Sequence, residues 1–203
     1  MIDKQKSIEK LSRECIDSVK KRFGEKTVFL GEGDLDSKLV LVGEAPGEQE
    51  EKQKRPFVGQ AGKNLQKFLD IVDLERKDIY ITNVVKFRPY KINPQTGRKS
   101  NRAPNRDEIE LCSKFLLHEI DIISPNIIVT LGNTALKVFM GNSAAIGDYH
   151  GRGILIQNAD MRIQRHIFCL YHPASIIYRK DLLSIYEEDL GELREYLKKN
   201  DRI

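Results

Sequence analysis

Four short, continuous runs of apolar residues stand out along the chain, separated by segments in which apolar and polar residues alternate with helical spacing. The runs occupy residues 38–43, 79–85, 127–131 and 166–171. A strand that is apolar at almost every position is typical of a parallel sheet, because helices cover both faces of such a sheet. The pattern therefore predicts four buried parallel strands.

The segments around these runs predict helices. Apolar residues return every three or four positions in residues 4–22, 61–71, 106–122, 133–140 and 181–199. Alternation of strands and helices indicates an α/β fold, a three-layer α/β/α sandwich with the sheet in the middle. We expect a single domain over residues 1–203 with a central four-stranded parallel sheet and one long loop at about 86–105.

Composition narrows the class of protein. The chain has 203 residues, of which 40% are hydrophobic and 32% charged, as in an ordinary globular domain with a buried core. No apolar run reaches the roughly 18–20 residues that cross a membrane, and the charged N-terminus lacks the apolar centre of a secretory signal. Cys15, Cys112 and Cys169 are few, far apart and odd in number, which excludes a disulfide framework. We therefore expect a cytoplasmic protein with no membrane partner.

Polar residues follow the ends of the predicted strands. Glu44 lies in a Gly-Glu-Ala-Pro-Gly segment after the first run, Asn83 ends the second, and His172 follows the fourth. Ligands of open α/β sheets bind outside the carboxyl ends of the strands, where these three side chains are expected to converge. The pattern favours a site for a small ligand. The alternative is that each residue merely caps a turn.

The long loop concentrates the basic charge of the chain. Its residues 86–106 hold seven basic side chains and no acidic one, whereas the whole chain carries a net charge of only +4. The seven are Lys86, Arg88, Lys91, Arg98, Lys99, Arg102 and Arg106. Such a loop is suited to nucleic-acid phosphates, with Tyr90 available to stack on a base. The alternative is a solvated surface loop.

Several motifs in order resemble the uracil-DNA glycosylase superfamily, and most of all its family 4 (A-type) enzymes. They span roughly residues 28–197 and read GEAPGEQE (43–50), RPFVGQAG (55–62), ITNVVKFRP (81–89), PNRDEIELC (104–112), PNIIVTLGNTA (125–135) and HPAS (172–175). The resemblance implies a four-stranded parallel sheet between helices. It also implies an enzyme that flips deoxyuridine out of DNA and hydrolyses the N-glycosidic bond to free uracil and an abasic site, which starts base-excision repair. The resemblance gives no lysine of these motifs the role of forming a Schiff base, so a monofunctional glycosylase is expected.

The resemblance assigns roles to the residues that hold the base. His172 would hydrogen-bond uracil O2 as negative charge develops there, and Phe57 would stack on the flipped base. Asn83 would pair with O4 and N3–H of uracil and reject cytosine, which presents the reversed donor and acceptor pattern. The alternatives are a strand-end histidine bonded to the backbone, a core phenylalanine and a turn-capping asparagine.

The first motif supplies the remaining contacts to the substrate. Glu44 is the candidate to orient water or stabilise the sugar cation, and the neighbouring Ala45, Pro46 and Gly47 are expected to line the substrate site. Ala45 stands where other families carry a water-activating Asp or Asn, so the mechanism is expected to depend on leaving-group stabilisation. Glu50 would close the pocket near uracil C5 and exclude thymine. Both carboxylates are alternatively explained as favourable charges at a helix start.

The segment 174–180 resembles the DNA-intercalating loop of the family. Ser175 lies in it, Ile176 or Ile177 would fill the gap left by the flipped nucleotide, and Arg179 and Lys180 would contact phosphates. Packing of these isoleucines within the protein is the alternative. Together with the basic loop, the expected DNA-binding residues are Lys86, Arg88, Arg98, Lys99, Arg102, Ser175, Ile176 and Arg179.

Two departures from the family pattern change the expectation. Family 4 enzymes hold a four-iron, four-sulfur cluster with four cysteines, but this chain has Cys15 with Ser18, Phe87 and Cys112 at those positions. Four thiolates are the usual requirement, so we expect no cluster and no other metal. The basic loop resembles that of the X-type enzymes, whose histidine traps DNA covalently, but Asn101 stands there. We expect a monomer acting on uracil-containing DNA; the alternative is a non-catalytic or covalently trapping binder of uracil-containing or damaged DNA.

Overall fold

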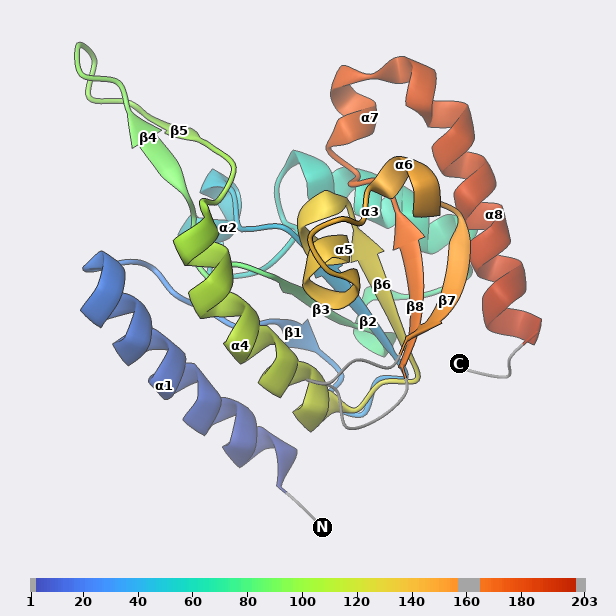
Figure 1. Cartoon of the computed structure of the whole chain (residues 1–203), viewed down its shortest axis with the longest axis horizontal. Helices are drawn as coiled ribbons and strands as arrows, with labels where there is room; N and C mark the ends of the chain where they lie inside the picture. The colour runs from blue at the N-terminus through green and yellow to red at the C-terminus, as the bar shows by residue number, and fades with distance from the viewer. Residues whose placement is uncertain (1–2, 157–164, 200–203) are drawn as a thin grey trace.

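The computed structural model describes residues 3–156 and 165–199, which fold around one mixed β-sheet of six strands. The strand order is β1-β3-β2-β6-β8-β7 (Figure 1). The strands are β1 (Glu32–Gly33), β2 (Leu39–Gly43), β3 (Tyr80–Asn83), β6 (Ile127–Leu131), β7 (Arg152–Ile156) and β8 (Arg165–Leu170).

The four central strands correspond to the four apolar runs and are mutually parallel. The two edge strands, β1 and β7, are antiparallel to their neighbours and were not predicted. β1 has only two residues, and β7 is exposed at three of its five positions, so neither produces a continuous apolar run. The expected α/β fold is therefore confirmed, and the expected sheet of four strands is extended to six.

Helices cover both faces of this sheet. The bounds are α1 (Lys4–Phe23), α2 (Glu48–Gln53), α3 (Gln60–Ile71), α4 (Arg106–Ile123), α5 (Asn133–Met140), α6 (Ile146–Tyr149), α7 (Ser175–Tyr178) and α8 (Leu183–Lys199), with 3₁₀ turns η1 (Arg76–Asp78) and η2 (Lys180–Leu182). The five helices that the periodicity predicts are present with ends within two residues of those expected. The short helices α2, α6 and α7 have too few turns to show a period.

Two hydrophobic cores form because neighbouring residues of a strand point to opposite faces. On β2, Val40 and Val42 pack with α1, α4 and α5, whereas Leu39 and Leu41 pack with α3 and α8. Each face of the sheet is thus buried under helices, which explains why the central strands are apolar at nearly every position.

A β-hairpin projects from the body of the molecule where the long loop was expected (Figure 1). It consists of β4 (Tyr90–Ile92) and β5 (Lys99–Asn101), paired antiparallel. At its tip, the Asn93 carboxamide oxygen accepts from the backbone N–H groups of Gln95 and Thr96. The expected long loop thus contains a hairpin, which the pattern did not predict because its two strands have only three residues each and are mostly exposed.

The base of the hairpin is fixed to the start of α4. Asn105 caps this helix by accepting from the Glu108 N–H (2.9 Å), and the Glu108 carboxylate accepts in return from the Asn105 N–H (2.8 Å). The same carboxylate receives two hydrogen bonds of 2.7 Å from Arg102.

None of the helices within the described ranges is both long and apolar enough to cross a bilayer.

Candidate active site

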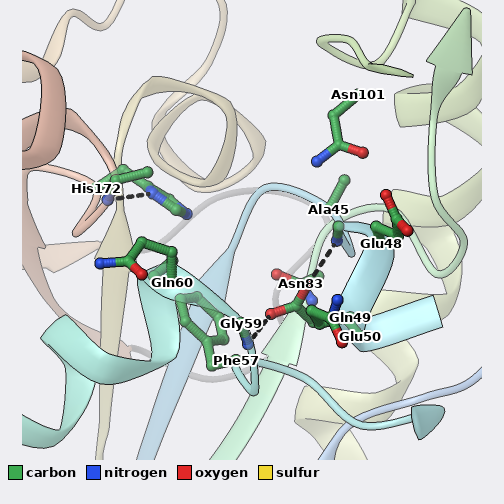
Figure 2. A pocket seen from close by; sticks show the side chains of 13 residues that line it. Ala45, Glu48, Gln49, Glu50, Phe57, Gly59, Gln60, Asn83, Asn101 and His172 are labelled. Carbon is green, nitrogen blue, oxygen red and sulfur yellow. Dashed lines mark hydrogen bonds between the residues drawn. The ribbon is translucent and has the colours of Figure 1, made fainter. Parts of the chain in front are cut away.

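A pocket of about 330 Å³ opens at the carboxyl ends of β2, β3 and β8, the edge of the sheet that the sequence pattern indicates (Figure 2). Its volume is in the range of small-molecule sites. It is lined by Ala45, Gly47, Glu48, Gln49, Glu50, Phe57, Gly59, Gln60, Ala61, Asn83, Asn101, His172 and Ala174. The structure thus brings six expected residues together: Ala45, Gly47, Glu50, Phe57, Asn83 and His172. Glu44 and Pro46 do not line this pocket.

His172 lies on one side of the pocket with its ring tautomer fixed by the backbone (Figure 2). The N–H of Ala174 lies 3.1 Å from Nδ1 of His172, so Nδ1 accepts and the proton of the neutral ring resides on Nε2. Burial lowers the pKa of His172 to about 4, and the nearby Glu50 carboxylate opposes this shift only in part. At neutral pH the side chain is therefore an uncharged N–H donor.

Phe57 provides an aromatic surface between His172 and Asn83 (Figure 2). Its ring centroid lies 5.8 Å from that of His172 at an interplanar angle of 27°. The backbone of Phe57 is left-handed, with φ of 52°, which is unusual for a bulky residue. Arg76 holds this conformation by donating to the carbonyl oxygens of Pro56 (2.5 Å) and Phe57 (3.2 Å).

Asn83 presents its carboxamide to the pocket from the last position of β3. The residue is only 5% exposed, and within residues 3–156 and 165–199 no hydrogen bond to its carboxamide is found. Room for this side chain depends on Gly43, because a Cβ there would lie 2.4 Å from Asn83 Oδ1 and 2.6 Å from the Phe57 ring. A buried carboxamide with unused donors and acceptors is suited to a polar ligand.

Glu50 joins the two loops that form the pocket wall. Its carboxylate accepts from the backbone N–H groups of Gly47 (3.1 Å), Val58 (3.1 Å) and Gly59 (2.7 Å). These bonds occupy both carboxylate oxygens. The observed contacts of Glu50 are therefore those of a buried structural link between the segments 43–50 and 55–62.

Glu44 lies beside the pocket and faces α5. Its carboxylate accepts a 2.5 Å hydrogen bond from the Thr134 hydroxyl, near the start of that helix. The side chain is half-buried. A carboxylate fixed at this point borders the strand ends without contributing to the pocket lining.

Comparison with known proteins supplies the family. The family model described as the uracil DNA glycosylase superfamily matches residues 30–198. The chain belongs to this superfamily. It is 40% identical over 196 residues to a type-4 uracil-DNA glycosylase of Sulfurisphaera tokodaii. This match covers 93% of this chain and 84% of the relative. Type-4 enzymes of Thermotoga maritima (38% identical, 85% of this chain and 84% of the relative) and Archaeoglobus fulgidus (35%, 81% and 79%) are similar over most of their lengths.

The membership in this superfamily agrees with the motifs, but the structure corrects two DNA-binding assignments. Lys86 is only 1% exposed, and its ammonium group forms an ion pair of 2.5 Å with the buried Glu119. Arg88 is only 4% exposed and contacts Glu48 and Glu51. The prediction that these two cations contact DNA was wrong, because both point into the protein and neutralise carboxylates there.

The other expected DNA-binding residues are distributed over two surfaces. Arg98 and Lys99 are exposed on the hairpin, whereas Arg102 is paired with Glu108 at its base. On the other side of the pocket, Ser175 Oγ donates to the His172 carbonyl (2.6 Å) and Arg179 pairs with Asp181 (2.5 Å).

The structure describes the side chain of only one of the two candidates for an intercalating residue. Ile176 is half-buried and packs against the core under α3 and α8. The side chains of Ile177 and Lys180 lie outside the described part of the chain.

Seven pocket residues were not assigned to the substrate site by sequence, and three of them carry amide side chains, Gln49, Gln60 and Asn101 (Figure 2). The other four are Glu48, Gly59, Ala61 and Ala174. Asn101 reaches the pocket from the end of β5, and its Oδ1 accepts a 2.7 Å hydrogen bond from the buried Arg88. The spacing to Ala103-Pro104 singles out this position only as the counterpart of the X-type histidine. Gln49 and Gln60 lie within the recognised motifs 43–50 and 55–62, which is the signal that points to them.

The cysteines lie away from the pocket. Cys15 and Cys112 are fully buried with Phe87 in the core beneath α1 and α4, and Cys169 is buried on β8. Burial raises the pKa of Cys15 to about 12 and of Cys169 to about 11, and it also raises the pKa of Cys112. Within the described residues, no three His, Cys, Asp or Glu side chains are grouped as metal ligands.

Proposed function

We propose that this chain is a monofunctional uracil-DNA glycosylase that releases uracil from DNA and leaves an abasic site. Membership of the superfamily and the type-4 relatives support the activity. The observation that carries the assignment of the site is the presence, across one pocket, of an uncharged His172 N–H donor and an Asn83 carboxamide that has no hydrogen-bond partner among the described residues. In this proposal the two side chains meet the two polar edges of a flipped uracil.

The proposed reaction breaks the bond between C1′ of deoxyribose and N1 of uracil. The bonding electrons move onto the base, so negative charge develops on uracil while the sugar gains oxocarbenium character. The Nε2–H of His172 stabilises this charge at O2 with no transfer of its proton, because a neutral imidazole is a poor acid. A water molecule then adds to C1′ and loses a proton to solvent, and the departing uracil anion takes up a proton from solvent.

Asn83 selects the base. Its Oδ1 accepts from uracil N3–H and its amide N–H donates to O4, whereas cytosine has an acceptor at N3 and a donor at C4. Cytosine would therefore leave buried polar groups of both partners unpaired, which a closed site penalises strongly. Phe57 stacks on the base face and contributes affinity without reading its edge.

Glu44 acts on the sugar side of the bond. The hydroxyl of Thr134 fixes the Glu44 carboxylate at the strand ends, from which it stabilises the sugar cation and orients the water. Glu50 acts indirectly, since its backbone bonds hold the two loops of the pocket wall. Exclusion of thymine by Glu50 stays a prediction.

Uracil-containing DNA is the proposed macromolecular partner. The hairpin carries Lys91, Arg98 and Lys99 in exposed positions, and Lys99 lies 4.3 Å from the centre of the Tyr90 ring. This surface adjoins the pocket through Asn101, so a strand whose nucleotide enters the pocket passes close to it. An amide at position 101 is a poor nucleophile, which favours turnover over covalent trapping.

We further propose that the chain is a monomer in the cytoplasm and that it holds no iron–sulfur cluster. The residues at the family's ligand positions do not fit such a group, because two thiols stand where four are needed. The Phe87 ring is fully buried there and lies 5.6 Å from the Phe23 ring. Aromatic packing thus joins α1 to the core at this place.

A multiple-turnover assay on an oligonucleotide with one deoxyuridine tests the activity. We expect uracil release in excess of enzyme, with a loss of about 10²- to 10³-fold in His172→Ala and a clear loss in Glu44→Gln. Lys21→Ala, at an exposed position on α1, serves as the control. Tight binding without uracil release would contradict the proposal and indicate a damage binder, and an adduct that stops at one equivalent would indicate trapping.

A further inference from the structure

The buried Lys86 ammonium group lies directly beneath the end of β3. Its Nζ donates to three oxygens: the Asn83 carbonyl (2.7 Å), the Thr82 hydroxyl (2.8 Å) and Oε2 of Glu119 (2.5 Å). A lysine ammonium has three protons, so every donor is used. The backbone of Asn83 is therefore fixed by a charged group that solvent does not reach.

Glu119 extends this network to three parts of the fold. The side chain is 0% exposed on α4. Its Oε1 accepts from the Gly31 N–H (2.7 Å) and the Tyr80 hydroxyl (2.8 Å), and its Oε2 accepts from the Thr82 hydroxyl (2.9 Å). The ion pair thus connects α4, the segment before β1 and the end of β3.

Burial of both charges is costly in free energy, and an apolar pair of similar volume often stabilises a fold as well or better. Stability alone is therefore a weak explanation for this pair. The pair does, however, hold one backbone carbonyl that belongs to the base-reading residue. On the opposite side of that backbone, the Asn83 carboxamide faces the pocket and has no protein partner among the described residues, so only its backbone and packing orient it.

We propose that Lys86, with Glu119 as its counterion, is a positioning residue that sets the orientation of Asn83 toward the base. The proposal rests on the uracil-DNA glycosylase activity proposed above and assigns Lys86 a role in base selection instead of DNA binding. Lys86 acts through the Asn83 carbonyl and touches neither base nor phosphate. A displacement of about 1 Å in a reading group reduces the rate roughly a hundredfold.

The test compares Lys86→Met, and the double variant Lys86→Met with Glu119→Gln, with the wild-type chain. The double variant removes both charges together, so no unpaired charge remains buried if the single variant fails to fold. The carboxamide introduced by Glu119→Gln retains an oxygen for Gly31 and Tyr80. Arg165→Met is the matched control, because Arg165 is also a buried cation (3% exposed) paired with a carboxylate, Asp121, but lies at the start of β8, the far end of the sheet.

Single-turnover cleavage of deoxyuridine is measured with each variant alone and combined with Asn83→Ala. We expect a roughly tenfold to hundredfold loss in folded Lys86 variants, little further loss when Asn83→Ala is already present, and a near wild-type rate for Arg165→Met. The salt dependence of DNA binding should be unchanged. A wild-type rate in the folded double variant, a loss that adds fully to that of Asn83→Ala, or a lower salt slope would overturn the proposal.

A second readout separates this proposal from the activity itself. If the wild-type chain releases no uracil, the proposed function fails, and binding is compared instead for oligonucleotides that contain one deoxyuridine or one deoxycytidine at that position. Preference for deoxyuridine that is lost in the double variant and kept in Arg165→Met supports positioning by Lys86. Preference that survives in the double variant, or that the wild-type chain lacks, refutes it.

Discussion

The backbone N–H of Ala174 donates to Nδ1 of His172 and thereby leaves the ring proton on Nε2, the nitrogen available to a ligand. Because burial also lowers the pKa of His172 to about 4, the neutral donor persists well below the ordinary histidine pKa of about 6.5. We expect single-turnover rates that show no loss attributable to His172 between pH 7 and about pH 5. A fall in rate centred near pH 6.5 that disappears in His172→Asn would contradict this.

The same pKa difference affects stability, with a definite sign. Above pH 6.5 the histidine is neutral in both the folded and the unfolded chain and contributes no pH dependence. Between pH 6.5 and about 4 only the unfolded chain binds the proton, so the free energy of unfolding decreases as the pH falls. Denaturant titrations at several pH values should show a shallower decrease for His172→Asn than for the wild-type chain.

Arg76 is expected to control Phe57 from outside the pocket. Its guanidinium donates to the Phe57 and Pro56 carbonyls, and Glu32 anchors it at 2.7 Å. In Arg76→Gln the left-handed Phe57 backbone loses this support, so a roughly tenfold lower cleavage rate is expected. Arg55→Gln is the control, since Arg55 also pairs with Glu32 but does not bond to the Phe57 carbonyl. Equal effects of the two variants would exclude specific control of Phe57.

Salt dependence should distinguish the exposed cations of the hairpin from Arg102, which is paired with a carboxylate. Arg98 and Lys99 are exposed, whereas Arg102 is held by Glu108. Removal of one cation that binds a phosphate changes the slope of log K against log salt by about 0.9 for duplex and 0.7 for single strands. We expect such a change in Arg98→Ala and Lys99→Ala and little change in Arg102→Ala. Slopes equal to that of the wild-type chain in all three variants would show that these hairpin cations do not contact phosphates.

The cysteines should be unreactive in the folded chain. Burial raises the pKa of Cys15 to about 12 and of Cys169 to about 11, and a thiol reacts through its thiolate. A chromogenic disulfide reagent should titrate three thiols after unfolding and almost none before it, consistent with three cysteines in the chain.

The isolated protein should lack iron and the visible absorption of a cluster; stoichiometric iron would refute the cluster-free proposal.

The parts that the sequence predicts well are those in which local pattern and burial agree. The apolar runs place Asn83 and His172 at strand ends, and the geometry of parallel strands brings them together at one edge. The capping box at the start of α4 is a signal that the sequence does contain, since Asn105 and Glu108 have the required spacing. It indicates that α4 starts after Asn105 and that Glu108 bonds back to the start of the helix, beside the base of the hairpin.

Other features depend on partners that are distant in sequence. Lys86 stands in a basic segment, and no neighbouring residue indicates that its side chain is buried and pairs with Glu119, 33 residues later. The two-residue strand β1 leaves no pattern to detect. The left-handed backbone of Phe57 likewise depends on Arg76, which lies 19 residues away. Charge counted along a chain therefore overestimates the charge available to a ligand.

Asn101 belongs both to the hairpin and to the pocket wall. The sequence of the hairpin tip can therefore change without affecting the pocket, whereas the residues at the end of β5 cannot. Asn101 ends β5 and lines the pocket, whereas residues 93–98 connect the two strands at the tip and do not line the pocket. Insertion of residues at the tip in register-preserving pairs would alter how far the hairpin reaches along a bound strand and leave the pocket wall intact. A shift of one residue in the β4–β5 register would put a different side chain beside the base. Reach along DNA and chemistry at the base can therefore diverge independently in this fold.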